Sequence, residues 1–432
     1  MSKDNFFEKT GKATPIITSI YTADPSAVVG QDGRMYIYAS HDCYPRDNVD
    51  NIDRYHVFSS DDLTSWIDEG EILRSDDVEW GIPSGGYMWA PDCAFKNGKY
   101  YFYFPHPDKE PWGLNFKIGV AVSDYPAKDF KVIGYVDCPS EDGVIDPNIF
   151  IDDDGRNYLY YGGIGIPRCV ELEDDMITIK KESVIKVEGL HDYHEGPWVF
   201  KRNGIYYMTY PDNFVNRNRM AYAISDSPMG PWKYKGFYLS PTGSMTSHGS
   251  VVSFKGKWYC FYHNCAISND PWLRSVCMDE LFFEDDGSIK PVIQTSKPIK
   301  LFEYKQNTNS KDMQYGLEKA RLCCESISDN ETTVAVLNNY GDRIIFKHIN
   351  GFDGGRFNIR ITYSRVGHNT AIRLVVNSDD QGAINIISTA LEDVYSNIAN
   401  FTVKLRPGKV NEIRLEYLDG RVRIKEIFVE KI

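Results

Sequence analysis

Three acidic residues occupy equivalent places in three separate apolar segments of this sequence. Asp24 precedes Pro-Ser-Ala-Val-Val, Asp146 precedes Pro-Asn-Ile-Phe-Ile and Glu195 precedes Gly-Pro-Trp-Val-Phe, so each acid stands five residues before the last apolar residue of its segment. A charged carboxylate at the head of a buried segment is costly unless another group pairs with it or a reaction uses it. The three acids are therefore candidates for one site.

Carboxyl groups that share a pocket change one another's protonation. Burial and like charges raise the pKa of one carboxyl, so that it stays protonated while another is ionised. Such a pair can protonate a leaving oxygen and activate a water molecule, which is the combination that cleavage of a glycosidic bond requires. A single acid beside proline is a common turn residue, but three in register favour a shared site.

The elements that must position these acids are predicted by an internal repeat. Its copies have tyrosine three residues after glycine and begin at Gly33, Gly98, Gly155, Gly204 and Gly256. In the first four copies a polar pair precedes the glycine, which indicates the tight turn of a β-hairpin. Successive copies are 65, 57, 49 and 52 residues apart, a length typical of a propeller blade with four short strands.

A second recurring element supports the same architecture. Segments 58–66, 121–126 and 223–232 each contain Ser-Asp and predict outer hairpins of the repeating unit. Helical periodicity is nearly absent, so we predict an all-β fold in which residues 1–303 form a five-bladed β-propeller. Because the innermost strands of all blades converge on one axis, we expect the three acids to face one another in a central cavity.

The blade pattern stops after residue 303. A mostly polar stretch at 306–314 predicts a linker. Beyond it the sequence shows short alternating strands, such as 343–347, 357–363 and 421–429. Residues 304–432 are therefore predicted to form a separate β-sandwich of the jelly-roll type.

Charge and cysteine usage disfavour several partners and compartments. A formal net charge of −13 and a pI near 5.2 disfavour nucleic acid, because phosphate contacts need Lys or Arg. No segment approaches the ~18 apolar residues of a spanning helix, so we expect no membrane partner. Nine cysteines without CxxC spacing favour reduced thiols. With acidic residues where a signal peptide would be apolar, they predict a cytoplasmic protein, provided that the native sequence begins here.

Six motifs in chain order resemble those of glycoside hydrolase family 43. They are Ala23–Pro25, Trp89–Asp92, Ile145–Asn148, His194–Pro197, Ser247–Ser250 and Arg274–Asp279. The resemblance covers residues 13–303, and most of the motifs lie beside a copy of the repeat. It implies a five-bladed propeller and a glycosidase that inverts the anomeric configuration.

The resemblance also implies a role for each acid. Asp24 matches the general base that activates water, and Glu195 matches the general acid. Asp146 matches the residue that raises the pKa of Glu195 and orients it, which agrees with the effect of a nearby like charge.

Four further residues are assigned to the site by resemblance. His248 matches a histidine that helps to hold a central ion, often calcium, through water; no cofactor is expected for the chemistry itself. Arg274 matches an arginine that reaches sugar hydroxyls and the catalytic acids, Trp89 matches a platform for a sugar face, and Asp42 is a further candidate for substrate binding. The alternatives are a hydrogen-bonded core histidine, a surface salt bridge and a core tryptophan.

The C-terminal domain resembles a carbohydrate-binding module of family 6. All eight tryptophans precede residue 273, so the aromatic candidates for stacking on sugar are tyrosines. They are Tyr304, Tyr315, Tyr340, Tyr363, Tyr395 and Tyr417. A structural role in support of the propeller is the alternative interpretation.

The leading hypothesis is an inverting exo-glycosidase that removes α-L-arabinofuranosyl side chains from xylo-oligosaccharides. The expected partners are plant cell-wall oligosaccharides, in particular arabinoxylan fragments. The alternatives are a β-xylosidase, an enzyme with both activities, and a non-catalytic sugar-binding propeller. A retaining fructan-cleaving enzyme would need a Trp-Met-Asn-Asp-Pro-Asn type of motif, and a sialidase would need an arginine cluster; the inner strands predict neither.

Overall fold

A computed structural model describes the chain from residue 15 to residue 432 with gaps. The residues outside the description are 1–14, 18–19, 43–48, 64–65, 83–84, 109–114, 140–142, 164, 166, 214–217, 267, 269, 295–302, 307–313, 319–320, 328–329, 338–341, 350, 352, 366–369, 378, 387–396 and 408–410. Most of the predicted linker lies outside the described residues, as do Tyr340 and Tyr395.

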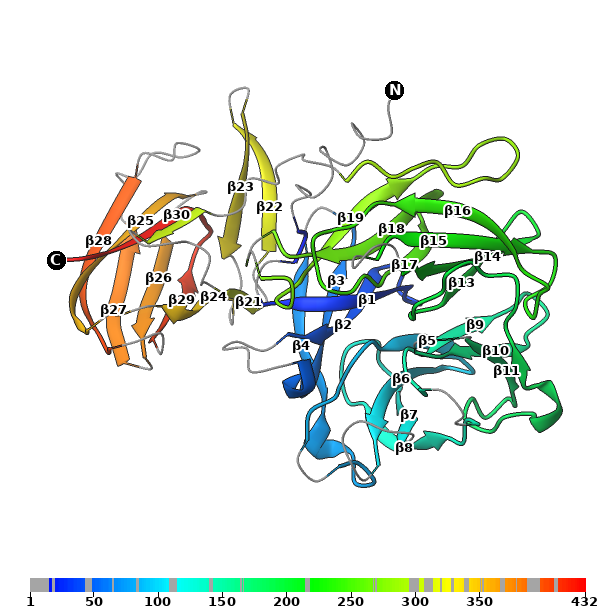
Figure 1. The fold of residues 1–432 in the computed structure, drawn as a ribbon. Coiled ribbons are helices and arrows are strands. Elements are labelled where there is room, and N and C mark those ends of the chain that lie inside the picture. Colours follow the sequence, from blue (N-terminus) through cyan, green and yellow to red (C-terminus); the bar gives the residue numbers. More distant parts are fainter. Residues whose placement is uncertain are drawn as a thin grey trace. The chain divides into compact units, whose positions relative to one another are not determined.

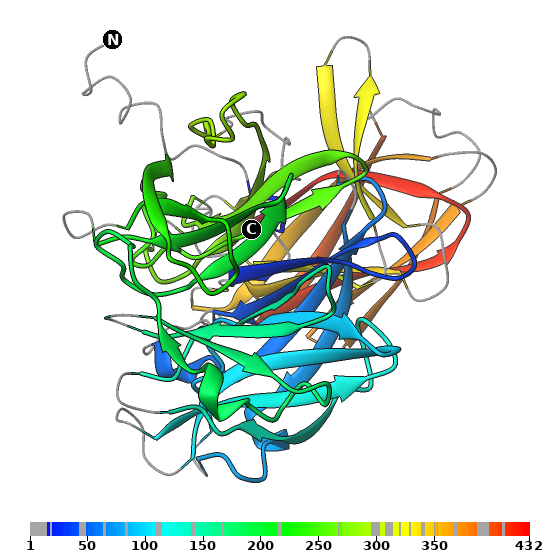
Figure 2. The ribbon, with the colours of Figure 1, turned by 90° about the vertical axis from the view of Figure 1, so that its right-hand side faces the viewer.

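The chain divides into two compact units. The first comprises 1–15, 21–58 and 70–296, and the second comprises 16–20, 59–69 and 297–432. In the first unit, five antiparallel sheets follow one another in chain order round a common centre, from blue through cyan to light green (Figure 1, Figure 2). The predicted five-bladed β-propeller is thereby confirmed.

The blades are numbered along the chain. Their strands are β1 (Thr22–Val29), β2 (Met35–His41), β3 (Arg54–Ser60) and β4 (Ile67–Arg74) in blade 1; β5 (Asp92–Lys96), β6 (Lys99–Pro107), β7 (Phe116–Ser123) and β8 (Lys131–Val136) in blade 2; β9 (Asn148–Ile151), β10 (Asn157–Tyr161), β11 (Arg168–Leu172) and β12 (Ile185–Lys186) in blade 3; β13 (Trp198–Arg202), β14 (Ile205–Pro211), β15 (Met220–Ser225) and β16 (Lys233–Leu239) in blade 4; and β17 (Ser250–Phe254), β18 (Lys257–Asn264) and β19 (Ser275–Leu281) in blade 5.

The glycines of the repeat lie in the turns between the first two strands of each blade. In blade 2, Asn97 and Gly98 both have positive φ, at 51° and 80°, as a two-residue type I′ turn requires. In blade 5, Lys255 and Gly256 adopt the same conformation, at 48° and 80°. The fifth copy, which lacks the polar pair, therefore forms the same kind of turn as the copy in blade 2.

A second position of the repeat holds neighbouring blades together. The tyrosine five residues after the glycine is fully buried in blades 1, 2 and 3. Its hydroxyl donates to a main-chain carbonyl in the outer turn of the next blade: Tyr38 to Pro126 at 2.6 Å, Tyr103 to Met176 at 2.7 Å, and Tyr160 to Pro228 at 2.5 Å. Tyrosine suits this place because its ring fills the interface while its hydroxyl reaches a partner.

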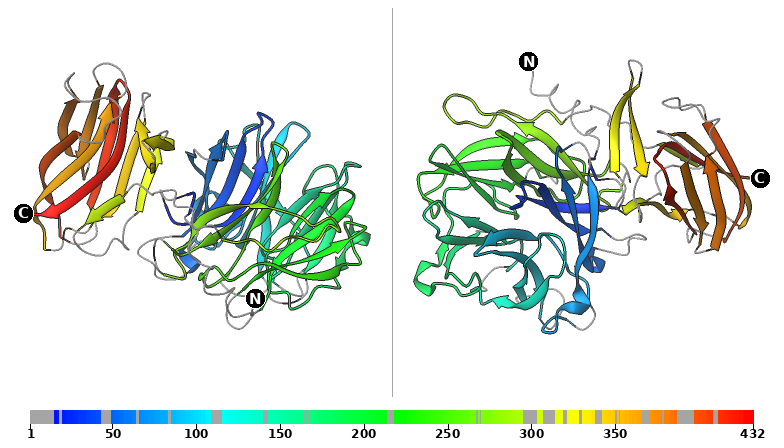
Figure 3. Two further views of the ribbon diagram at one scale, coloured as in Figure 1. Left: turned by 90° about the horizontal axis from the view of Figure 1, so that it is seen from above. Right: turned by 180° about the vertical axis from the view of Figure 1, so that it is seen from behind.

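The second unit is a β-sandwich with a single apolar core. One sheet has the order β22-β23-β30-β25-β28, with β20 beside β30, and the other includes β21-β24-β29-β26-β27 (Figure 3). The strands are β20 (Glu303–Gln306), β21 (Gln314–Glu318), β22 (Arg321–Ile327), β23 (Asn330–Leu337), β24 (Arg343–Ile349), β25 (Gly355–Arg365), β26 (Thr370–Val376), β27 (Asp379–Ile386), β28 (Asn397–Leu405), β29 (Asn411–Asp419) and β30 (Val422–Lys431). Tyr363 and Tyr417 pack against this core, half-buried.

Helical structure is confined to three short 3-10 turns within the described ranges. They are η1 (Val49–Asn51), η2 (Ser75–Asp77) and η3 (Lys181–Ser183). Over the part of the chain that the structure describes, no helix has the length and apolar character needed to cross a bilayer.

We expect Tyr160→Phe to lower the free energy of unfolding by ~1–3 kcal/mol, because it leaves the buried Pro228 carbonyl without its donor. Thermal unfolding followed by circular dichroism would measure the loss. Tyr125→Phe, at a ring that is 49% exposed, is the control and should change stability by less than ~0.5 kcal/mol. Equal stability of the two variants would contradict the proposed role of the repeat tyrosine.

Candidate active site

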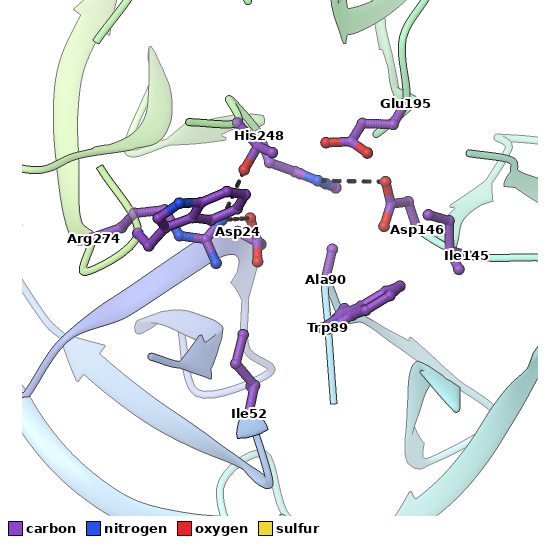
Figure 4. Close-up of a pocket in the computed structure, with 11 residues that line it drawn as sticks. Asp24, Ile52, Trp89, Ala90, Ile145, Asp146, Glu195, His248 and Arg274 are labelled. Carbon is purple, nitrogen blue, oxygen red and sulfur yellow. Dashed lines mark hydrogen bonds and ion pairs between the residues drawn. The ribbon is translucent and has the colours of Figure 1, made fainter. Parts of the chain in front are cut away.

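One cavity of about 340 Å³ contains all three acids (Figure 4). Its described lining residues are Asp24, Ile52, Trp89, Ala90, Ile145, Asp146, Glu195, Thr246, His248, Trp272 and Arg274. The structure thus brings together six of the seven residues singled out from the sequence, and they come from all five blades. The seventh, Asp42, lies next to this group without lining the cavity.

The backbone at two of the acids is strained. Asp24 and Asp146 have φ of 53° and 54°, although each precedes proline and neither is glycine, a combination that sterics disfavour. The ladder between β1 and β2 also shifts register between Ala23 and Ser26, as in a β-bulge that redirects a side chain. The strained backbone thus lies at two residues whose carboxylates line the cavity.

Asp24 is held as a carboxylate by donors on both oxygens. Arg274 Nη1 lies 3.0 Å from Oδ1, and Ser40 Oγ donates to Oδ2 at 2.6 Å. Burial alone would raise the pKa of Asp24, but Arg274, the two nearby histidines and the Ser40 hydrogen bond together outweigh burial, with Arg274 contributing most, and the pKa lies below its usual value. Asp24 is therefore ionised at neutral pH.

His263 fixes the main chain of Asp24. Its Nδ1 accepts from the Asp24 N–H at 3.0 Å, so Nε2 carries the hydrogen and donates to the Thr246 carbonyl at 2.8 Å. Burial, with Arg274 nearby, lowers the pKa of His263 to about 3. The ring is therefore a neutral acceptor, and the positive charge that acts on Asp24 is that of Arg274.

Asp42 holds Arg274 from behind. Arg274 Nε and Nη2 donate to the two oxygens of Asp42 at 2.9 and 2.8 Å, and the Arg274 main-chain N–H donates at 2.8 Å. Arg274 is only 4% exposed and Asp42 only 2%, so this ion pair is buried rather than on the surface. Asp42 was expected to reach the pocket; the structure places it behind the arginine, with both oxygens occupied.

Asp146 and Glu195 form a buried pair that retains a proton. Burial raises the pKa of Asp146 well above its usual value, and the charges of Glu195 and Asp24 raise it further. Burial also raises the pKa of Glu195, although His194 opposes the shift. Like charges in one apolar cavity disfavour double ionisation, so the pair binds one proton at neutral pH.

His248 lies against this pair. Its Nδ1 is 4.0 Å from Asp146 Oδ2, and burial lowers its pKa, so the ring is neutral. Calcium prefers six to eight oxygen ligands, whereas the described residues contain no group of three His, Cys, Asp or Glu side chains placed to hold a metal. His248 therefore lacks the donor set of a direct calcium site, and no catalytic step is assigned to an ion.

The structure adds site residues that the sequence did not single out. Trp272 lines the cavity together with Trp89, and both are half-buried. Trp272 stands two residues before Arg274, so its position beside a site motif was the available signal. His263 gave no such signal, because its contact with Asp24 joins residues 239 positions apart.

Carboxylates of opposite protonation in the central cavity of a five-bladed propeller define a glycoside hydrolase of the propeller class. A model of glycosyl hydrolases family 43 matches residues 13–289 of the sequence. The chain belongs to glycosyl hydrolase family 43.

Two curated relatives are similar to more than half of this chain. A xylosidase/arabinosidase 43A from Humicola insolens is 38% identical over 335 residues, which cover 64% of this chain and 98% of the relative. A xylosidase/arabinosidase from Bacteroides ovatus is 34% identical and covers 63% of this chain and 95% of its own.

Solved structures give the same result for the fold. CoXyl43, a β-xylosidase/α-arabinofuranosidase from a compost metagenome crystallised with xylotriose in a calcium-free form, is 34% identical with a TM-score of 0.59, covering 66% of this chain and 98% of its own. An arabinoxylan arabinofuranohydrolase from Bacillus subtilis, in complex with cellotetraose, covers 98% of this chain and 99% of its own with a TM-score of 0.59. At 23% identity the second structure shows a shared fold alone.

Arg274→Met should move the acidic limb of kcat/KM to higher pH. Without the guanidinium, burial is opposed only by weaker groups such as the Ser40 hydroxyl, so the pKa of Asp24 rises and Asp24 becomes ionised only at a higher pH. Arg274→Lys retains a positive charge and is the control. The acidic limb of this variant should stay closer to the wild-type position. Its kcat/KM should still fall, because lysine cannot make the two hydrogen bonds to Asp42 that the guanidinium makes. Rates on an aryl pentoside across pH would test this; an unmoved limb in the methionine variant would refute it.

Proposed function

We propose that this protein is an inverting exo-glycosidase that removes α-L-arabinofuranosyl side chains from xylo-oligosaccharides. One observation carries the proposal: an ionised Asp24, held by Arg274, shares a small cavity with the Asp146–Glu195 pair, which retains a proton. Inversion requires such a base and acid, and in inverting enzymes the two carboxyls are generally roughly 6.5–9.5 Å apart to admit a water molecule.

In the proposed reaction Asp24 accepts a proton from water as the water oxygen attacks the anomeric carbon. Glu195 donates its proton to the glycosidic oxygen as the bond between that oxygen and the anomeric carbon breaks. Attack comes from the face opposite the leaving group, so the sugar is released with inverted configuration. Afterwards Asp24 holds the proton and Glu195 is ionised, and exchange with solvent restores the starting state.

The proposed scheme places the proton of the pair on Glu195, although burial raises the pKa of Asp146 more strongly than that of Glu195. The Gly196 N–H donates to Asp146 Oδ2 at 3.0 Å, a contact that favours Asp146 as the ionised partner. A charged Asp146 then raises the pKa of Glu195 and keeps it protonated until the leaving oxygen needs the proton. Asp146 acts through Glu195 and is a positioning residue in this scheme.

The size and walls of the cavity support a terminal pentose as the substrate unit. A volume of about 340 Å³ is at the low end of the ~300–1,000 Å³ found for small-molecule pockets, which fits removal of end units rather than cleavage within a long chain. Trp89 offers a half-buried ring for a sugar face, and arabinoxylan fragments supply terminal arabinose.

A β-xylosidase, or an enzyme with both activities, is the second candidate. The relatives from Humicola insolens and Bacteroides ovatus are named xylosidase/arabinosidase, and both pentoses are neutral and similar in size. A non-catalytic sugar-binding propeller is less consistent with the site, because all three acids are present.

Two accessory features belong to the same proposal. We propose a calcium ion beside His248 that is bound through water molecules and has an electrostatic or structural effect. The sandwich is proposed to resemble a family 6 carbohydrate-binding module in fold while serving a structural role. Tyr363 and Tyr417, the two candidate tyrosines whose side chains are described, pack against its core.

Hydrolysis of an aryl α-L-arabinofuranoside and an aryl β-D-xyloside, measured side by side, tests the substrate. We expect the arabinoside to be cleaved faster, with β-arabinose as the first anomer seen by NMR. Faster cleavage of the xyloside would favour the second candidate. A retained anomer would refute the mechanism, and no cleavage of either would favour a binding function.

Glu195→Gln should lower kcat on natural oligosaccharides by ~10²–10⁴-fold. The loss should be much smaller on an aryl glycoside with a good leaving group, since that group departs with little help from an acid. Asp24→Asn is the contrast: it should lose activity on both substrates, because every substrate needs an activated water. Equal losses for Glu195→Gln on the two substrates would remove it from the acid role.

A further inference from the structure

Asp92 is a buried acid that the proposed mechanism does not use. It is 1% exposed and begins β5, the innermost strand of blade 2. Oδ1 accepts from Ser26 Oγ at 2.6 Å and from the Cys93 N–H at 2.7 Å. Oδ2 accepts from Asn148 Nδ2 at 3.0 Å and from the Ile149 N–H at 2.6 Å.

These contacts join three blades through one side chain. Ser26 belongs to β1 of blade 1, two residues after Asp24, and Asn148 belongs to β9 of blade 3, two residues after Asp146. Asp92 therefore ties the strand that carries the base to the strand that carries the partner of the acid.

The same contacts are part of a closed ring around the propeller axis. From blade 3 to blade 4, Asn148 Oδ1 accepts from the Val199 N–H at 2.8 Å. From blade 4 to blade 5, Trp198 Nε1 donates to the Val251 carbonyl at 3.0 Å. From blade 5 back to blade 1, the Ala27 N–H donates to Ser250 Oγ at 3.1 Å. Every interface between neighbouring blades thus has a hydrogen bond at this level.

The axis beside this ring is hollow rather than packed. A second cavity of about 370 Å³ is lined by the innermost strands of all five blades, including Val28, Asp92, Ile151, Trp198 and Val252. Where side chains do not fill the axis, the positions of the inner strands depend on the hydrogen bonds between them.

Asp92 acts in this ring as an acceptor. Burial raises its pKa to about 7, although the four donors oppose the shift. A neutral carboxylic acid could keep these contacts only by donating its own hydrogen to the Ser26 hydroxyl, which can also accept. Each oxygen accepts from one main-chain N–H, that of Cys93 or of Ile149, so asparagine cannot reproduce the junction, because its amide nitrogen would face one of these donors.

We propose that Asp92 is a positioning residue that sets the separation between Asp24 and the Asp146–Glu195 pair by holding β1 and β9 at a fixed distance. The inference rests on the proposed hydrolytic function and extends it. Asp92 does not line the catalytic cavity as the structure describes it, so its effect on the reaction comes through the two strands. A displacement near 1 Å is enough to cost ~100-fold in rate.

Asp92→Asn should lower kcat by ~10–100-fold and leave KM within about threefold, because the sugar contacts remain while the acid and base lose their spacing. Asp152→Asn is the matched control. Asp152 is also a buried acid between blades, accepting from Lys201 Nζ at 2.8 Å and Tyr206 Oη at 2.6 Å, but it follows the far end of β9. It should lose stability and keep kcat within about twofold.

Steady-state kinetics on the aryl pentoside that the wild type cleaves would give both constants. If Asp92→Asn retains kcat within twofold of Asp152→Asn, the positioning role is refuted. If Asp92→Asn does not fold, Ser26→Ala removes one of the four donors and should lower kcat by about 3–10-fold; an unchanged kcat there also refutes the role.

Crystal structures of the wild type and Asp92→Asn separate this inference from the proposed function. We expect the distance between the Asp24 and Asp146 carboxyl carbons to change in the variant. An unchanged distance overturns the inference whether or not the wild type hydrolyses pentosides, whereas an inactive wild type with a changed distance overturns only the proposed function.

Discussion

The charge balance of one small cavity constrains most of what this protein can do. Asp24, Asp146 and Glu195 line it, and Arg274 is the one cationic side chain among its described lining residues, since burial keeps His248 neutral. Arg274 also faces the buried Asp42, so its single charge already has two carboxylates to balance. Full ionisation of the remaining pair would leave two uncompensated charges in an apolar site. This charge balance therefore favours retention of one proton by Asp146 and Glu195 in the free protein.

The repeating blade explains how residues 24 to 274 come to share that cavity. Each blade is built from local hairpins whose turn glycines and buried tyrosines are visible in the sequence. The propeller and the convergence of the three acids could therefore be predicted without long-range information. The sandwich was likewise predictable from alternating strands, although the tyrosines chosen as sugar-binding candidates reflect composition alone, and two of them pack against the core.

The parts that could not be predicted depend on contacts between blades. Asp42 and Arg274 are 232 positions apart and meet only because the first and last blades are neighbours in a closed ring. The sequence identified both residues but could not show that Asp42 lies behind the arginine. The role of Asp92 could not be predicted for the same reason. The Trp-Ala-Pro-Asp motif indicated only its tryptophan, because the hydrogen-bond partners of its aspartate belong to two other blades.

The tyrosine contacts between blades have a consequence for how this fold can vary. In each case the acceptor is a main-chain carbonyl in an outer turn, as at Met176. A carbonyl is supplied by any amino acid, so the side chains of these turns can be exchanged without removing the bond. Selection can therefore reshape the rim of the propeller, where new contacts with large substrates or other proteins would form, while the spacing of the inner strands is preserved. The blade interface separates the part of the molecule that must stay fixed from the part that is free to evolve.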